Sequence, residues 1–207
     1  MTDAQQEELI KRVFRELQDS GLVRPTHRLR RFKNDGPDRY PEFHAGTYHF
    51  RTIYYGFGNC SFDADSLRFI LLHEERHLRG MRDWFAYLFN VIGWTSLFIY
   101  LALFRNLQPP WSSLAVLIVP ATWYGSMPFL RIGETRSDLW AARHMKAEFG
   151  IARPSEVALK AMTFPPREMS RAQRVLRNIL FDALHADYHP PLKKRIERIA
   201  REVDNDP

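Results

Sequence analysis

Residues 71–78 read LLHEERHL, a stretch that places His73 and His77 four positions apart, with Glu74 directly after the first histidine. Side chains four positions apart project from the same face of an α-helix, so both imidazole rings can reach one metal ion. Glu74 lies about 100° further around the helix, where its carboxylate can reach a water molecule on that ion without being a ligand. The pattern predicts a zinc peptidase centre, although two histidines also fall one turn apart by chance in charged helices.

The composition is that of a folded protein. The chain has 207 residues, of which 45% are hydrophobic, and this is ample for a buried core. A net charge of +6 favours anionic neighbours, either phospholipid head groups or nucleic acid. No RNA or DNA motif accompanies that charge, so no nucleic-acid partner is expected. The single cysteine, Cys60, excludes an internal disulfide and a cysteine-based zinc site, so a zinc ion must be held by histidine and carboxylate.

The N-terminal residues predict an amphipathic helix. Residues 4–20 carry apolar side chains at helical spacing, with Thr2 or Asp3 as the cap and Gly21 as the stop. The first twenty residues are charged and have no apolar core, so they are expected to be neither a secretory signal nor a membrane anchor.

The next segment predicts a loop followed by a small β element. Residues 24–43 are basic and interrupted by proline and glycine, which is typical of a loop. Residues 46–58, GTYHFRTIYYGFG, are rich in β-branched and aromatic residues and predict a short strand or hairpin. The part of it from Tyr48 to Tyr55 is a candidate edge strand for pairing with an extended substrate. Ser66 is then expected to cap the helix that carries His73 and His77.

Two uncharged apolar runs predict a membrane hairpin. Residues 84–104 and 111–130 each contain about twenty residues without a formal charge, enough at ~1.5 Å per residue to cross a ~30 Å hydrocarbon layer. The alternative is a buried helical hairpin in a soluble protein, which Asn90, Thr95 and Pro120 favour.

The charges around these runs predict their orientation. Basic residues cluster before residue 84 and after residue 130, whereas the connecting loop carries only Arg105. Both flanks are therefore expected in the cytoplasm, with two spans in the cell inner membrane and both termini and the active site on the cytoplasmic side. Because a hairpin returns the chain to the side it left, the segment after residue 130 is expected beside the helix that precedes residue 84.

Residues 133–145, GETRSDLWAARHM, predict a second helix with metal-binding residues. A catalytic zinc ion normally takes three protein ligands and keeps a fourth position for water. Glu134 can supply the third ligand, and Asp138, one turn later, can orient a ligand or pair with a cation. Seen alone, the two would be read in preference as an ordinary exposed acidic pair on a helix that ends at Gly150. Five other histidines lack ligand spacing and are expected to be surface or hydrogen-bonded polar residues: His27, His44, His49, His144 and His185.

The order of these motifs resembles the membrane zinc metallopeptidases typified by the heat-shock protease HtpX and the CAAX prenyl proteases. Their pattern is HExxH, two membrane spans and ExxxD, which matches His73 to His77, the two apolar runs, and Glu134 to Asp138. The late segment HPPLKKRIERI resembles the family's His-Pro block. The resemblance implies that His189 helps to bind the developing oxyanion and that Arg195 makes an ionic contact near Glu134 or Asp138.

Two features depart from that family. The middle residues of its HExxH motif are usually uncharged, whereas here they are Glu75 and Arg76. A charged pair at these positions requires that this face of the helix be solvated or engage partners. Asp83 follows the motif closely, which is similar to a cousin group, the membrane metallopeptidase domains of antibiotic-sensing receptors.

Together these features predict a mainly α fold with a small β element, a zincin-like metallopeptidase with a transmembrane hairpin inserted between its metal-binding helices. Residues 1–83 hold the N-terminal helix, the β element and the HExxH helix, 84–130 the hairpin, and 131–207 the third-ligand helix and C-terminal helices. The expected function is zinc-dependent hydrolysis of peptides or proteins, with Glu74 and His189 catalytic and Zn²⁺ on His73, His77 and Glu134. The alternative is a non-catalytic sensor or scaffold of the same fold.

Overall fold

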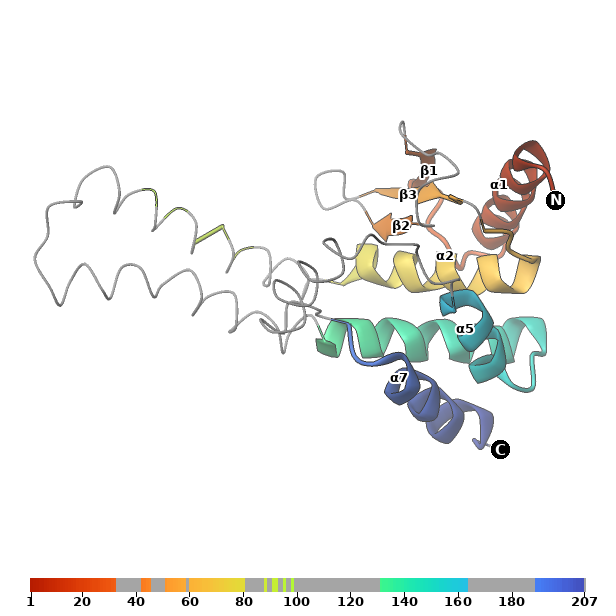
Figure 1. Cartoon of the computed structure of the whole chain (residues 1–207), viewed down its shortest axis with the longest axis vertical. Coiled ribbons are helices and arrows are strands. Elements are labelled where there is room, and N and C mark those ends of the chain that lie inside the picture. Colours follow the sequence, from red (N-terminus) through yellow and green to blue (C-terminus); the bar gives the residue numbers. More distant parts are fainter. Residues whose placement is uncertain are drawn as a thin grey trace, which may run out of the picture. The chain divides into compact units, whose positions relative to one another are not determined.

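The computed structural model describes residues 1–32, 42–45, 51–58, 60–80, 131–163 and 189–206, together with positions 88, 91, 92, 95 and 98. Over these residues the chain is mainly helical with a small sheet, as predicted (Figure 1). Contacts divide the chain into two units, Met1–Arg79 with Thr135–Pro207, and Gly80–Glu134. The boundary after Glu134 falls within the first turns of one continuous helix, residues 131–149, so Glu134 is held by the same helix as the residues that follow it.

The predicted N-terminal helix is α1 (Asp3–Asp19). It begins with a capping box, in which the Thr2 hydroxyl accepts from the Gln5 N–H and the Gln5 side chain accepts from the Thr2 N–H. It ends before Gly21, whose φ of 74° is a left-handed conformation that glycine adopts without steric cost. Its apolar stripe faces the core through Ile10, Val13, Phe14 and Leu17.

The sheet has three strands in the order β1-β3-β2: β1 (Arg28–Arg31), β2 (Glu42–Ala45) and β3 (Thr52–Gly56). The central strand β3 pairs parallel with β1 and antiparallel with β2. The prediction of a loop over 24–43 was therefore wrong at both β1 and β2, whose backbones pair with a distant strand that the local sequence does not reveal. The prediction that Tyr48 to Tyr55 forms an edge was also wrong, because β3 is paired on both sides; residues 48–50 lie outside the described residues.

The helix with the two motif histidines is α2 (Ala64–Arg79). It begins earlier than predicted because Asp63, and not Ser66, provides the cap: the Asp63 carboxylate accepts from the Ser66 N–H at 2.8 Å. Figure 1 shows α2 with the sheet and α1 on one side and helix 131–149 on the other. Leu67, Leu71 and Leu72 on α2 are fully buried, so this helix is the centre of the core of its unit.

Helix 131–149 runs antiparallel to α2 (Figure 1) and ends before Gly150, whose φ is 66°. It is followed by α5 (Pro154–Met162), which packs against α2. After the segment that lies outside the described residues, α7 (Leu192–Ile199) continues into a π-helical turn, η2 (Ala200–Asp204).

Polar contacts fasten the C-terminal elements to the rest of the unit. The Lys146 ammonium donates to the Val203 carbonyl at 2.9 Å, and the Asp204 carboxylate accepts from the Ser155 N–H at 3.3 Å. These contacts fix α7 and η2 against helix 131–149 and α5, and thereby position Arg195 on α7.

Within the described residues, no helix is long and apolar enough to cross a membrane. The two predicted spans, 84–104 and 111–130, lie outside the described residues apart from five positions in the first run. These five are helical and exposed: Leu88, Val91, Ile92, Thr95 and Phe98. The hairpin therefore stays a prediction.

Candidate metal centre

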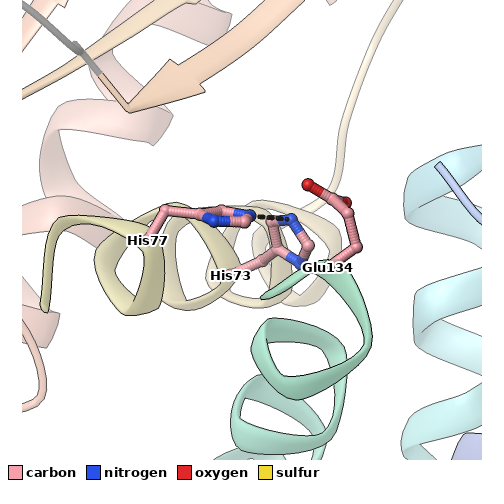
Figure 2. A group of neighbouring side chains, drawn as sticks. All are labelled: His73, His77 and Glu134. Atoms are coloured by element: carbon pink, nitrogen blue, oxygen red, sulfur yellow. Dashed lines mark hydrogen bonds between the residues drawn. The ribbon is translucent and has the colours of Figure 1, made fainter. Parts of the chain in front are cut away.

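The three predicted metal ligands lie close together. Figure 2 shows the imidazoles of His73 and His77 on α2 beside the carboxylate of Glu134 on helix 131–149. One ligand atom from each residue lies within 4.8 Å of the other two, and the Nε2 atoms of the two histidines are 3.0 Å apart. His73 and Glu134 are buried, with exposed fractions of 8% and 5%, and His77 is half-buried. Side chains from before and after the two apolar runs thus converge on one point.

Asp138 contacts His73 on the side of the ring away from His77. Its Oδ1 lies 2.9 Å from His73 Nδ1, and both of its oxygens accept from the Arg195 guanidinium at 2.6 Å. Burial alone would raise the pKa of the Asp138 carboxyl, but the contacts with His73 and Arg195 outweigh it and hold that pKa below its ordinary value. An ionised Asp138 at this distance favours a proton on Nδ1 of His73, which would leave the Nε2 lone pair for a metal.

The donor set fits zinc. Two imidazoles and one glutamate are the protein ligands of one recognised class of catalytic zinc sites, which leave a fourth position for water or substrate. Two nitrogens at ~2.05 Å from a tetrahedral zinc ion stand ~3.3 Å apart, close to the 3.0 Å between the two Nε2 atoms. The Glu134 carboxylate sits at the end of a side chain with three rotatable bonds, which lets it close the remaining gap.

The two predicted catalytic residues occupy different surroundings. Glu74 is buried, with 9% exposed, and directly follows His73 on α2. Its place next to the metal-bound water stays a prediction. His189 is exposed and lies shortly before α7 begins. Within the described part of the chain it is not in the group formed by His73, His77 and Glu134, so its role on an oxyanion stays a prediction.

The charged residues inside the motif behave differently from each other. Arg76 is half-buried, whereas Glu75 is fully buried and contacts His27 Nδ1 through Oε2 at 2.6 Å. His27 is therefore a hydrogen-bonded polar residue, as predicted. The importance of Glu75 was missed by sequence reasoning, although one signal was available: a carboxylate on the buried face of an amphipathic helix requires partners.

No protein-family model, curated protein or solved structure matches the chain. The functional inference therefore depends on the motifs and on the geometry of the candidate centre.

Proposed function

We propose that the chain is an integral membrane zinc metalloendopeptidase that hydrolyses peptide bonds at the cytoplasmic face. The observation that carries the proposal is the convergence of His73, His77 and Glu134 within 4.8 Å of one another. The three residues come from two helices that the sequence separates by two apolar runs. His73 and His77 were expected as ligands from their spacing, and Glu134 from its place directly after the second run. A chance cluster of acidic and histidine residues would not be expected to combine a motif helix, two apolar runs and a following acidic helix in this order.

Each residue has a defined task in this proposal. A zinc ion held by His73, His77 and Glu134 would supply a Lewis acid that lowers the pKa of water from ~15.7 towards ~7. Glu74 takes a proton from the attacking water as that water adds to the peptide carbonyl. It then gives the proton to the leaving amine as the C–N bond breaks. Outside this proton transfer, Asp138 keeps His73 in the tautomer that binds through Nε2.

The proposal also places the substrate. Among the strands that the structure describes, β2 is an edge of the sheet, and it packs against α2. An extended peptide that adds to β2 by backbone hydrogen bonds would run along the helix that carries His73 and Glu74. His189 is proposed to donate to the developing oxyanion, a contact typically worth ~3 kcal/mol of transition-state stabilisation.

The membrane part of the proposal is supported by the first apolar run. The five positions described in this run, 88, 91, 92, 95 and 98, are helical, and their side chains are exposed. Four of them are large and apolar, with exposed fractions from 37% at Leu88 to 65% at Phe98. Exposed apolar side chains at these four positions of an uncharged run of about twenty residues fit contact with lipid tails.

Catalysis is tested by Glu74→Gln in the full detergent-purified chain. We expect this variant to retain zinc, measured by elemental analysis, and to lose ~10²- to 10⁴-fold of its cleavage of a denatured protein such as casein. The matched control is Glu8→Gln, an exposed residue on α1, which should change neither quantity. Equal cleavage by Glu74→Gln and the parent would contradict the mechanism, and bound zinc without cleavage of casein or of a peptide library would favour the non-catalytic sensor or scaffold.

The membrane assignment is tested separately by extraction of membranes with alkaline carbonate. An integral hairpin keeps the protein in the pellet and requires detergent for release. Quantitative release into the carbonate supernatant would contradict the two spans without affecting the metal centre.

A further inference from the structure

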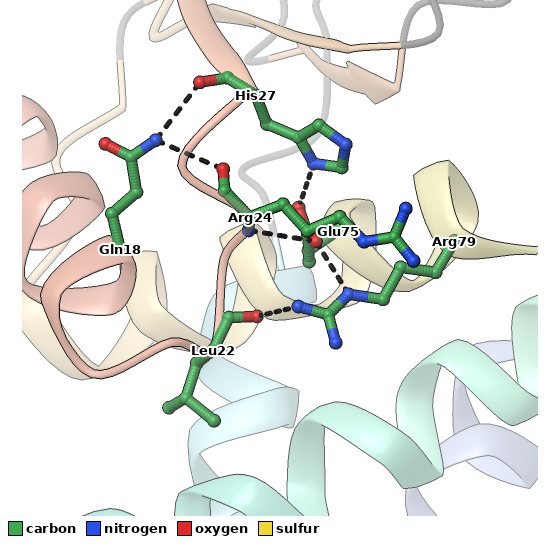
Figure 3. A network of polar contacts seen from close by, with 6 residues as sticks. All are labelled: Gln18, Leu22, Arg24, His27, Glu75 and Arg79. Atoms are coloured by element: carbon green, nitrogen blue, oxygen red, sulfur yellow. Dashed lines mark hydrogen bonds and ion pairs between the residues drawn. The ribbon is translucent and has the colours of Figure 1, made fainter.

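Glu75, between the two motif histidines, is the centre of a buried polar network (Figure 3). It lies ~200° around the helix axis from His73, on the face of α2 away from the candidate metal centre. Its exposed fraction is 0%. Its Oε2 lies 2.6 Å from His27 Nδ1, and its Oε1 accepts from Arg79 Nε at 2.7 Å and from the Arg24 N–H at 3.3 Å. Two oxygens thus serve three donors, and a residue of another charge or shape cannot satisfy all of them.

Arg79 carries this network to two other segments. A second guanidinium nitrogen donates to the Leu22 carbonyl at 2.8 Å, in the loop that follows α1. The central carbon of the Arg79 guanidinium lies 5.3 Å from the centroid of the Trp140 ring. Trp140 is on the helix that also carries Glu134 and Asp138. The loop is fixed in turn, because Gln18 on α1 donates to the carbonyls of Arg24 and His27 (Figure 3).

We infer that the Glu75–Arg79 pair is a positioning device for the metal centre, holding the helix of His73 and His77 against the helix of Glu134. The inference rests on the proposed function. Glu75 lies within the turn that carries both imidazoles, and Arg79 lies two residues after His77, so a shift of this turn displaces two ligands relative to the third. Close-packed interiors transmit such shifts instead of absorbing them. Neither residue belongs to the group of candidate ligands, so both would act through His73, His77 and Glu134.

The chain contains a matched control at the other end of α2. Arg68 also pairs with carboxylates, those of Glu16 and Asp65, and its guanidinium carbon lies 4.9 Å from the Phe149 ring on the same helix 131–149. The two arginine side chains have similar exposed fractions, 21% for Arg68 and 26% for Arg79. They join the same two helices by the same chemistry, but Arg68 lies more than one turn before the first ligand.

The experiment compares Arg79→Lys with Arg68→Lys in the full detergent-purified chain. Lysine keeps the charge but loses the planar fork and the ring contact. Zinc affinity is measured by competition with a chelator, and ligand geometry by the visible absorption spectrum of the Co²⁺-loaded protein. We expect Arg79→Lys to weaken zinc binding ~10-fold, the lower end for residues that support ligands, and to change the Co²⁺ spectrum. Arg68→Lys should leave both unchanged even where it lowers the melting temperature as much.

If Arg79→Lys does not fold, Glu75→Gln, which preserves the side-chain volume, provides the same comparison. Equal zinc affinities and superimposable Co²⁺ spectra for the variants at 79 and 68 would overturn the positioning role while leaving the proposed function intact. Failure of the parent chain itself to bind zinc or Co²⁺ would overturn the proposed function, and the positioning role with it.

Discussion

Two imidazole–carboxylate contacts flank α2, one on each side, and they have different surroundings. His73 Nδ1 lies 2.9 Å from Asp138, and His27 Nδ1 lies 2.6 Å from Glu75. Both histidines are buried, and both carboxylates also bind an arginine. His73 and Glu75 are two positions apart, which turns them ~200° around the helix axis. The first contact therefore faces helix 131–149 and Glu134, and the second faces the loop after α1.

The difference lies in what surrounds each ring. His73 has His77 and Glu134 nearby as further donors, whereas His27 and Glu75 belong to no group of three such donors in the described part of the chain. A buried histidine held by a carboxylate is thus not by itself a metal site. A buried histidine is a candidate ligand only where a second and a third donor lie close to it. The following predictions test this distinction.

The largest difference in zinc affinity is expected between two single substitutions, His73→Ala and His27→Ala. His73→Ala removes a ligand and should lower zinc affinity by more than ~100-fold, beyond the ~10- to 100-fold typical of losing a supporting residue. His27→Ala should change zinc affinity by less than ~3-fold, because the Glu75–Arg79 contact persists. Chelator competition on both purified variants measures the contrast, and comparable losses for the two would remove the distinction between the sites.

Asp138→Asn is expected to have the next largest effect. The substitution keeps the shape but removes the charge that orients His73 and neutralises Arg195, so zinc affinity should fall ~10- to 100-fold. The unfolding free energy should fall by ~3 kcal/mol or more, because the Arg195 guanidinium remains buried without its counter-charge. An unchanged zinc affinity in a folded Asp138→Asn protein would show that Asp138 serves only the ion pair.

His27→Ala is expected to lower the unfolding free energy, although it leaves the candidate metal ligands in place. Removing the imidazole leaves Glu75 Oε2 buried and without its hydrogen-bond donor, which should cost ~1–3 kcal/mol of unfolding free energy. Urea denaturation of the parent and the variant measures this cost at neutral pH. A loss below ~0.5 kcal/mol would indicate that His27 contributes little to the network.

The smallest predicted effect concerns the N-terminal end of α2. Burial alone would raise the pKa of Asp63, but contacts with Lys160 and with Ser66 lower it below its ordinary value. A depressed pKa stabilises the folded state above the unfolded value of ~3.9, and this stability is lost as pH falls through the folded value. Because the Asp63 side chain is 44% exposed, solvent screens these contacts and the effect should stay below ~1 kcal/mol. Urea midpoints of the parent and Asp63→Asn between pH 3 and 6 should therefore converge at the acid end, and parallel curves would contradict this assignment.

Sequence reasoning succeeded where the determining signal is local. The apolar stripe of α1, the stop at Gly21 and the four-residue spacing of His73 and His77 are all set by helical periodicity, which short segments specify by themselves. Glu134 and Asp138 also lie one turn apart on a helix, as their spacing predicts. The mainly helical fold could be predicted from these segments.

It failed where a distant partner decides the outcome. Arg28 to Arg31 were predicted as a loop because the basic segment around them is interrupted by proline and glycine, yet pairing with β3 makes them β1. The position of β3 in the middle of the sheet depends on that same non-local pairing. The need of Glu75 for a partner could be inferred from its place on the buried face of α2. The identity of that partner could not, since His27 stands 48 positions earlier, in the stretch predicted as a loop.

The most direct test is the metal content of the full chain purified in detergent, measured beside Glu134→Gln, which removes one donor and preserves the side-chain volume. The proposal predicts about one zinc per parent chain, and a loss of most of it in the variant after dialysis against a weak chelator. A parent chain that takes up no zinc, or a variant that keeps as much as the parent, would contradict the metal centre formed by residues 73, 77 and 134.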